Sequence, residues 1–533
     1  MKTLLTLFLL IPSLSWGLTF KDGKQVEDTS SDIKEEETIK KNICNEDQYL
    51  IDEGLLAKTY IFDFDALQKT THNFPTYKKH TPPDEPPVKS VTYIATKIHA
   101  VGDIDNDGID DLVLIFMETN VAPIILYGKK SKNFDVLELQ KLSKNFARKN
   151  YRKIVLNDIN NDGLLDIIGF TTAEHHPGFD MGEPNIIIKN LGNRKFEEID
   201  LPIFRKYDSN HGGFVIDLDN DGYSDIVALS DPAAPGKMSY PIKNINGNKF
   251  ELVKKDINRE ISNSWTHDGD GGDVNQDGFN DLVIASVKSE NLSEQNNFKT
   301  LRIILGDGDL NFHNNQVIKL GKNWVTKDEE KAFVEEYNYP LKTGSSNIQL
   351  IDINNDGLLD ILEGYYVLYN GTWASSGFNS YINKGNDCFL NETIRYFPNQ
   401  SLNRSFKNSL FTGFISGFHH SDVNNDGFND LVLRSWGNVY PHIFNQQIIP
   451  YVFMNIENKY YLPLDSSKSK NLKNMSSYIA GDFNGDGLMD IGGLNDPGLY
   501  SLNIFWGGSE TLKNSELNIN NEDLLQDLEL AIQ

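Results

Sequence analysis

Residues 271–285, GGDVNQDGFNDLVIA, combine oxygen-bearing side chains, a turn glycine and an apolar strand in a single short stretch. Oxygen atoms at positions 1, 3, 5, 7 and 9, counted from Asp273, can converge on one cation, with a backbone carbonyl serving at position 7. The five residues are Asp273, Asn275, Asp277, Phe279 and Asp281. Gly278 permits the sharp turn among them. The stretch therefore predicts a calcium loop between two β-strands. It differs from an EF-hand because its last acid stands at position 9 and no Glu follows at position 12.

The same spacing occurs seven times, and successive copies begin 55, 59, 56, 79, 70 and 60 residues apart. This interval suits one blade of a β-propeller and exceeds one coil of a solenoid. One copy alone is equally compatible with an Asx-rich turn. Seven copies with oxygens at the same positions favour Ca²⁺, because hard oxygen ligands select calcium over zinc. The six further sets of candidate ligands are Asp103, Asp105, Asp107, Ile109 and Asp111; Asp158, Asn160, Asp162, Leu164 and Asp166; Asp217, Asp219, Asp221, Tyr223 and Asp225; Asp352, Asn354, Asp356, Leu358 and Asp360; Asp422, Asn424, Asp426, Phe428 and Asp430; and Asp482, Asn484, Asp486, Leu488 and Asp490.

Each interval contains further short apolar runs separated by turn residues. Four intervals share a turn in which Gly or Asn precedes an aromatic residue, as in NLGNRKF at 190–196 and NINGNKF at 244–250. Four short strands with such turns make one blade. We therefore predict an all-β fold over residues 91–508, a seven-bladed β-propeller with four-stranded blades, a calcium loop in each blade and up to seven bound Ca²⁺.

These units resemble the FG-GAP repeats of the integrin α-subunit propeller and the related VCBS-type repeats of secreted proteins. The resemblance covers about 420 residues. It implies that each calcium loop joins the innermost strand of a blade to the second strand on the lower face of the ring. It also implies a role in cell adhesion, with ligands bound on the upper face.

The N-terminal 17 residues predict a secretory signal peptide, because an apolar run at 4–11 is followed by small residues at Ser15 and Gly17. The run is too short to span a membrane. We therefore expect a secreted, soluble protein, extracellular or periplasmic, without a transmembrane anchor. Residues 18–42 read as a flexible acidic leader, and residues 43–90 as an N-terminal extension with a proline-rich linker. Residues 509–533 read as a tail with a strand and a helix.

Two features of the termini stay open in the sequence. The last blade can be closed by a strand from the tail or by one from the N-terminal extension. Cys44 and Cys388 are the two cysteines of the chain. In an exported protein they predict a disulfide that fastens the extension to the propeller, and the alternative is two buried free thiols.

The net charge of −26 and a pI near 4.8 argue against nucleic acid or an anionic membrane as partner. An extracellular protein or a carbohydrate is the expected partner. If the calcium loops lie on the lower face, the upper face carries the long segments 171–184, 322–340, 364–379 and 435–444, which are rich in aromatic residues and histidine. Trp373 and Trp436 are candidate ligand-binding residues there; the alternative is that they pack the loops against the blades, as Trp324 also could.

Histidines stand before three of the calcium loops. His211 and His267 each precede the first ligand by six residues, where the innermost strand begins near the upper mouth of the channel, and His419 and His420 stand closer to theirs. They could form part of a binding, metal or catalytic site, although no HxH or HExxH spacing supports a zinc site.

Two classes of function agree with these patterns. The first is a non-catalytic adhesion or ligand-recognition propeller that calcium stabilises. The second is a secreted polysaccharide lyase or hydrolase on the same scaffold, since a fold does not fix a function. The sequence favours the first, because it contains neither a nucleophile elbow nor a catalytic triad pattern, and the regularly spaced carboxylates are assigned to metal.

Overall fold

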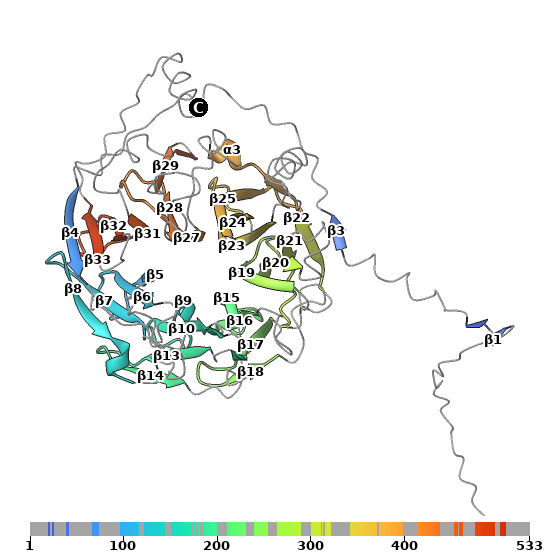
Figure 1. Ribbon diagram of the computed structural model, residues 1–533, viewed down its shortest axis with the longest axis horizontal. Coiled ribbons are helices and arrows are strands. Elements are labelled where there is room, and N and C mark those ends of the chain that lie inside the picture. Colours follow the sequence, from blue (N-terminus) through green and yellow to red (C-terminus); the bar gives the residue numbers. More distant parts are fainter. Residues whose placement is uncertain are drawn as a thin grey trace, which may run out of the picture.

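Seven sheets stand around a central axis in the computed structural model, with one strand of each nearest the centre (Figure 1). The structure describes residues 20–21, 24–25, 39–41, 67–73 and, with gaps, 96–507. The longest gaps in that last range are 200–209, 254–263, 289–299, 321–341, 398–413, 437–451 and 462–474. The predicted all-β seven-bladed propeller with four-stranded blades is confirmed.

The first four blades follow one another along the chain. The first contains β5 (Thr96–Gly102), β6 (Asp111–Phe116), β7 (Ile124–Lys129) and β8 (Asn133–Glu138), followed by the 3-10 helix η2 (Leu139–Lys141). The second contains β9 (Tyr151–Asn157), β10 (Asp166–Thr171), β13 (Ile186–Asn190) and β14 (Phe196–Ile199). The third contains β15 (Asn210–Ile216), β16 (Asp225–Ser230), β17 (Tyr240–Asn244) and β18 (Phe250–Leu252). The fourth contains β19 (Ser264–Gly272), β20 (Asp281–Lys288), β21 (Thr300–Ile304) and β22 (Val317–Leu320).

The last three blades complete the ring. The fifth contains β23 (Lys342–Ile351), β24 (Asp360–Tyr369), β25 (Thr372–Asn383) and β26 (Phe389–Asn391), followed by the short helix α3 (Thr393–Tyr396). The sixth contains β27 (Phe414–Ser421), β28 (Asp430–Trp436), β29 (Val452–Ile456) and β30 (Lys459–Tyr461). The seventh contains β31 (Met475–Gly481), β32 (Asp490–Asn495), β33 (Ser501–Trp506) and β4 (Gln68–Asn73). Within each blade, neighbouring strands are antiparallel.

The hydrophobic core is divided among the blades. Seven clusters of buried apolar side chains each join two neighbouring blades. Because both faces of a blade are covered, strands such as β10 and β33 are buried along their whole length. The cluster between the seventh and first blades contains Trp506, whose ring stacks with that of Phe134 at 6.4 Å between centroids. This distribution explains how one domain can exceed the usual size of a single core.

The N-terminal extension closes the ring. Strand β4 forms the outer edge of the seventh blade, antiparallel to β33, from the pair Ser501–Asn73 to the pair Trp506–Gln68. The indole Nε1 of Trp506 donates to Thr70 Oγ1 at 2.9 Å. In Figure 1, β4, in blue, lies beside the red β33 although more than 400 residues separate them. The sequence was compatible with a closing strand from either the tail or the N-terminal extension. In the structure, the extension supplies this strand.

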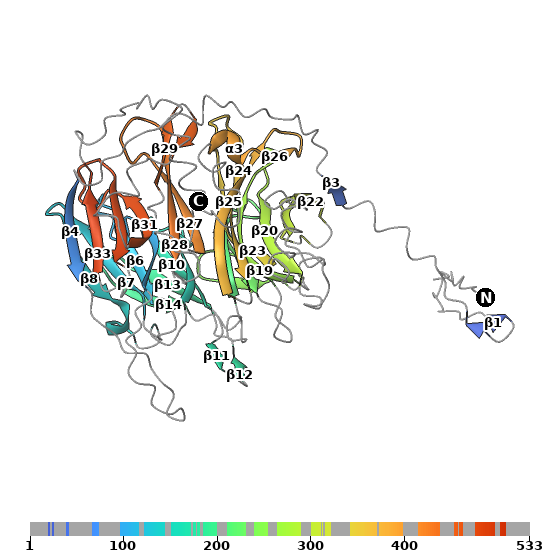
Figure 2. The ribbon, with the colours of Figure 1, turned by 45° about the horizontal axis from the view of Figure 1, so that its top comes forward.

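Other described segments lie outside the four-strand pattern. Strand β3 (Ile39–Lys41), within the predicted leader, pairs in parallel with β22 at the edge of the fourth blade. Strands β1 (Phe20–Lys21) and β2 (Lys24–Gln25) pair with each other. The hairpin of β11 (Glu174–His176) and β12 (Phe179–Met181) projects away from the ring (Figure 2). The tail 509–533 lies outside the described residues.

The fifth blade is longer than its neighbours. We expected an irregular loop at 364–379, but β24 and β25 pair as far as Tyr369 and Thr372, with one register shift between Val367 and Leu368. The two intervening residues are Asn370 and Gly371, a dipeptide typical of two-residue hairpin turns. The error arose because the aromatic residues of this stretch were attributed to a loop, whereas aromatic residues also favour strands.

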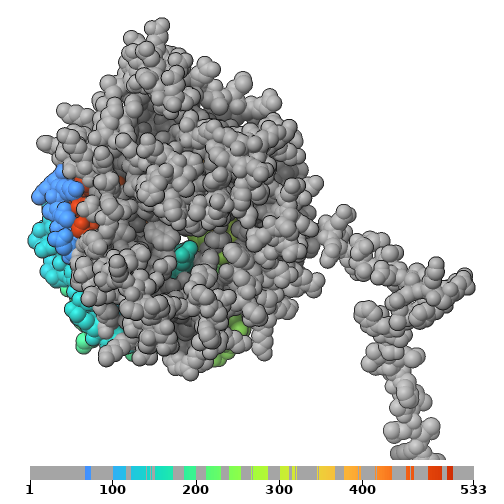
Figure 3. All heavy atoms as spheres, in the orientation of Figure 1, coloured from blue at the N-terminus to red at the C-terminus, as the bar shows by residue number. Residues whose placement is uncertain are grey.

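The ring surrounds a channel. In the space-filling view, teal atoms from the second blade lie at the wall of a central opening (Figure 3). Among the described residues, no helix is long and apolar enough to cross a membrane.

Candidate metal-binding loops and the central channel

Each predicted calcium loop joins the innermost strand of its blade to the second strand, as the resemblance implied. In the fourth blade, Asp273 Oδ1 accepts the N–H of Asp277 at 3.1 Å and its Oδ2 accepts the N–H of Gly278 at 2.8 Å. Asp277 Oδ1 in turn accepts the N–H of Phe279 at 2.9 Å. The bond from the glycine N–H to the first aspartate occurs in all seven loops at 2.8 or 2.9 Å. Gly278 has φ +91°, a conformation that disfavours other residues.

The aspartate at position 9 is buried in every loop and fixes the loop to its blade. In the fourth blade, Asp281 Oδ2 accepts the N–H of Val274 at 2.9 Å, and Oδ1 accepts the N–H of Gly306 at 2.7 Å. Gly306 follows the third strand, so this carboxylate joins three parts of the blade. Burial raises the pKa of Asp281 to about 7, despite these two hydrogen bonds. A cation beside a buried carboxylate favours its charged form.

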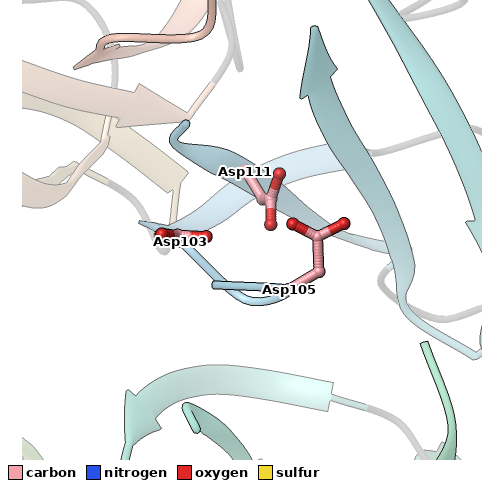
Figure 4. A group of neighbouring side chains, drawn as sticks. All are labelled: Asp103, Asp105 and Asp111. Carbon is pink, nitrogen blue, oxygen red and sulfur yellow. The ribbon is translucent and has the colours of Figure 1, made fainter. Parts of the chain in front are cut away.

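The described loop residues fit a hard cation. In the first and third blades, carboxylate oxygens at positions 1, 3 and 9 lie within 4.8 Å of one another. Figure 4 shows the first of these groups, in which the carboxylates of Asp105 and Asp111 face each other beside Asp103. Three position-3 oxygens are buried without a hydrogen-bond partner, and they are Asp105 Oδ1, Asn160 Oδ1 and Asp219 Oδ1. These oxygens stand at a predicted ligand position. A cation site requires such oxygens, which accept no hydrogen bond.

The two loops with aspartate at position 3 each have a basic partner. Arg194, in the β13–β14 turn of the neighbouring blade, donates to Asp105 Oδ2 through Nη2 at 2.8 Å and Nε at 3.0 Å. Lys243 of β17 pairs with Asp219, and its ammonium lies 3.1 Å from Asp221 Oδ2. The other five loops have asparagine at position 3. Four carboxylates with one basic side chain leave the same formal charge as three carboxylates with an asparagine. Sequence reasoning missed both basic residues because they lie far from their loops in the chain or on another strand.

The loops are connected to one another around the lower face. The residue at position 4 has positive φ in all seven loops. In three of them its side-chain amide donates to the carbonyl of the position-6 glycine in the next loop. The pairs are Asn161 to Gly222 at 2.8 Å, Asn220 to Gly278 at 2.9 Å and Gln276 to Gly357 at 3.1 Å. The recurrence of Asn or Gln at position 4 of the loops could have indicated these hydrogen bonds between loops, but we did not use it.

A polar network crosses the channel above these loops. Lys153 of β9 reaches past the third blade to Asp268 of β19, with Nζ 2.7 Å from Oδ1. The side-chain amide of Asn347, on β23, donates to the other oxygen of Asp268. Arg434 of β28 lies against Gly417, where a Cβ atom would meet its guanidinium. Its charge acts on Asp268, while burial lowers the pKa of Arg434 to about 10. Asp268 thus joins the second, fourth and fifth blades through its bonds to Lys153 and Asn347, and its charge acts on Arg434 of the sixth.

The remaining candidate residues have the following positions. His211 and His267 are the extra residues of β-bulges in β15 and β19. Trp373, on β25, pairs with Leu368, and Trp436 ends β28 opposite Phe414. These two tryptophans stand on neighbouring blades, away from the predicted calcium loops.

The histidines before the sixth loop are held within their blade. His420 bonds to Tyr460 Oη through Nε2 at 3.0 Å. Burial lowers the pKa of His419 to about 4, so this side chain is neutral at physiological pH.

Two predictions extend beyond the described residues. Trp324 and most of the segments 322–340 and 435–444 lie outside them. Cys388 lies in the turn before β26 and is disulfide-bonded. Cys44 lies outside the described residues, so its pairing with Cys388 stays a prediction. Strand β3 ends three residues before Cys44 and lies at the edge of the fourth blade, next to the blade that carries Cys388.

The sequence profile of the FG-GAP-like repeat matches residues 158–228, which include the loop of the second blade and the strands up to β16. The chain therefore contains an FG-GAP-like repeat, and its seven-bladed fold fits an FG-GAP repeat propeller. No curated protein matches the sequence.

Several solved structures match this chain at low similarity. The Bacillus licheniformis rhamnogalacturonan lyase PL11 is 12% identical with a TM-score of 0.39, and the match covers 83% of this chain and 76% of that one. The N-terminal domain of Nup159 is 10% identical with a TM-score of 0.37 and coverages of 88% and 98%. An ancestral GH74 enzyme, AFV00434, is 9% identical with a TM-score of 0.42, and this chain spans about half of its length, with coverages of 84% and 52%. Likenesses of this degree carry no argument.

Proposed function

We propose that this FG-GAP propeller is an exported, non-catalytic recognition protein, stiffened by up to seven Ca²⁺ and binding a protein or glycan ligand on its upper face. The observation that carries the proposal is the difference between the two faces. The lower face presents seven loops with nearly the same backbone and the same hydrogen bonds. A repeated surface of this kind encodes little specificity, whereas the upper connections differ from blade to blade. Variable loops on a rigid scaffold are where binding sites usually lie.

Calcium would serve the fold in this scheme. Bound in a loop, Ca²⁺ would supply positive charge to the carboxylates at positions 1, 5 and 9, and to the side chain at position 3. The unpartnered buried oxygens of Asp105, Asn160 and Asp219 support this role. The loops of the second to fifth blades are joined in series through their position-4 side chains. Order gained in one loop would therefore extend to its neighbours.

Trp373 and Trp436 are the residues we propose for ligand contact. Trp436 ends β28, and Trp373 stands at the start of β25, opposite Leu368 near the end of β24. Strands β24 and β28 start at the predicted calcium loops and run away from them, so both positions belong to the opposite, upper side of the fifth and sixth blades. Aromatic side chains on such a face suit both sugar rings and peptides, and they supply much of the binding energy at interfaces.

The test is a binding screen with an enzymatic control. Purified protein in calcium buffer is applied to a glycan array and to extracellular proteins, and release of reducing ends or unsaturated products from polysaccharides is assayed in parallel. We expect binding without product release. Turnover of any polysaccharide would contradict the non-catalytic assignment and favour a lyase or hydrolase.

A further inference from the structure

The side chain at position 3 differs among the seven loops in its hydrogen bonds, although the charge at the ligand positions does not differ. Two loops have four carboxylates and a basic partner, Arg194 or Lys243. The other five have three carboxylates and an asparagine. Both sets leave three formal negative charges, so charge alone does not separate the loops in their attraction for a cation. The orientation of the position-3 side chain does separate them.

In the fourth, fifth and sixth loops, the position-3 asparagine is bonded to position 5 of its own loop. Asn275 Oδ1 accepts the N–H of Asp277 at 3.0 Å, and its Nδ2 donates to Asp277 Oδ2 at 2.9 Å. Asn354 and Asn424 form the same two bonds. The bonds also fix the orientation of the amide, because only its oxygen can accept an N–H. The predicted ligand oxygen of these three loops therefore already has a donor.

In the seventh, first, second and third loops, the position-3 side chain lies beside the buried aspartate at position 9. The Nδ2 atoms of Asn160 and Asn484 each donate to an oxygen of that aspartate at 3.2 Å. Asp105 and Asp219 each have an oxygen within 4.8 Å of those of positions 1 and 9, as Figure 4 shows for Asp105. The Oδ1 atoms of Asp105, Asn160 and Asp219 are buried and have no donor. These neighbouring blades form a four-loop arc, and the fourth to sixth blades form a three-loop arc.

The second and fifth loops indicate the cause of the difference. Residues 158–167 and 352–361 have the same sequence, DINNDGLLDI. In the second loop, Gly247 of the next blade lies against Asn160, and a Cβ atom on this glycine would be 2.4 Å from Asn160 Cβ. The bond from Asn160 is partly buried, whereas both bonds of Asn354 in the fifth loop are exposed. Because the two loops are identical in sequence, the difference comes from how the next blade packs on them.

We propose that the seven loops form two classes of calcium site, with strong binding in the four-loop arc and weaker binding in the three-loop arc. In the four-loop arc the position-3 side chain already lies beside the buried aspartate. In the three-loop arc two hydrogen bonds must be replaced before the asparagine oxygen can face a cation, and their loss lowers the affinity by about tenfold or more. The proposal rests on the calcium role proposed above and adds its regulation, because a fall in free calcium would empty the fourth to sixth loops first.

The test is stepwise removal of calcium from the full chain. Calcium-saturated protein is dialysed against buffers of decreasing free calcium, and the calcium that stays bound is counted by elemental analysis. The three-loop arc should release its ions in a first step, and the four-loop arc should release its ions at a free calcium concentration about tenfold lower or less.

Two matched variants assign the steps to the arcs. Asn354→Ala and Asn160→Ala remove the same ligand from loops of identical sequence. Asn354→Ala should remove one ion from the first step, and Asn160→Ala should remove one ion from the second. Thermal unfolding in saturating calcium checks that each variant is folded. A variant that does not fold is replaced by Asn275→Ala for the three-loop arc or by Asn484→Ala for the four-loop arc, under the same criteria.

The outcomes separate this inference from the calcium role itself. Release of all ions in one step overturns the two classes, and so does loss of an ion from the same step in both variants or from the opposite steps. Each of these results leaves the calcium role intact. Protein that contains no calcium at saturation contradicts both. The two-step release is measured on the unchanged protein and decides the matter even where a variant fails.

Discussion

The side-chain amide of Asn190, at the end of β13, donates to the carbonyl oxygen of Ile104 in the loop of the preceding blade at 2.7 Å. Its backbone N–H donates to Asp166 Oδ1, also at 2.7 Å. One buried residue therefore joins the position-9 aspartate of its own blade to the predicted calcium loop of the preceding blade. Asn244 repeats both bonds toward Asp225 and Ile159, and Asn383 repeats them toward Asp360 and Val274.

Replacing Asn190 with alanine should destabilise the protein by about 1–3 kcal/mol, because the Ile104 carbonyl would be left buried without its donor. The control is Asn248→Ala in the exposed β17–β18 turn, where we expect a change within about 0.5 kcal/mol. Thermal and urea unfolding in calcium buffer measure both. Equal effects of the two substitutions would show that the link between blades adds no stability.

The contribution of Lys243 to the thermal stability should be largest when calcium is removed. The variant Lys243→Gln leaves Asp219 and Asp221 without their basic partner, so it should lower the melting temperature in excess EGTA, and the loss should shrink when calcium is restored. Lys189→Gln is the matched control, since Lys189 occupies the same place in the second blade, where the loop has Asn160 at position 3. A loss of stability that is the same for both variants, or the same with and without calcium, would contradict the charge balance described above.

Strand β4 should be required for the ring. Deletion of residues 1–75 removes it and exposes the edge of β33 together with Trp506 and Asn503, which hydrogen-bond to Thr70 and Thr71. We expect this truncation to melt far below the full chain or to aggregate, because unpaired edges associate. Deletion of residues 1–60 is the control, since it also removes Cys44 but keeps β4, and it should melt close to the reduced full chain. Similar melting of the two truncations would mean that the seventh blade is stable with three strands.

The predicted disulfide can be tested on exported, unreduced protein. If Cys44 and Cys388 are bonded to each other, no free thiol should react under denaturing conditions, and limited proteolysis between residues 45 and 66 should release the N-terminal segment only after reduction. Two reactive thiols, or release of the segment without reduction, would rule out the bond.

The sequence predicted the blades well because their determinants are local. Seven loops with fixed residue spacing, each followed by an apolar strand, identify the number of blades and the place of each loop between the first two strands of its blade without any knowledge of long-range contacts. The features that the sequence could not predict depend on contacts between segments that are distant in the chain. The partner of β33 could have been the tail, because both termini contain a short strand-forming stretch. Arg194 lies 89 residues from Asp105, and Lys153 lies 115 residues from Asp268. The bulges at His211 and His267 appear only once the register of two strands is known.

The central claim is that calcium holds these loops, and metal content measured together with thermal stability tests it most directly. Each occupied site adds about 2.7 kcal/mol at a free calcium concentration one hundred times the dissociation constant. Elemental analysis of protein purified without chelator should therefore find several calcium ions per chain, up to seven, and excess EGTA should lower the melting temperature steeply. Asp277→Ala should lower the melting temperature in calcium more than the substitution of an exposed aspartate outside the loops, such as Asp309→Ala. Protein that contains no calcium and melts at the same temperature with and without EGTA would show that the seven loops are turns and not metal sites.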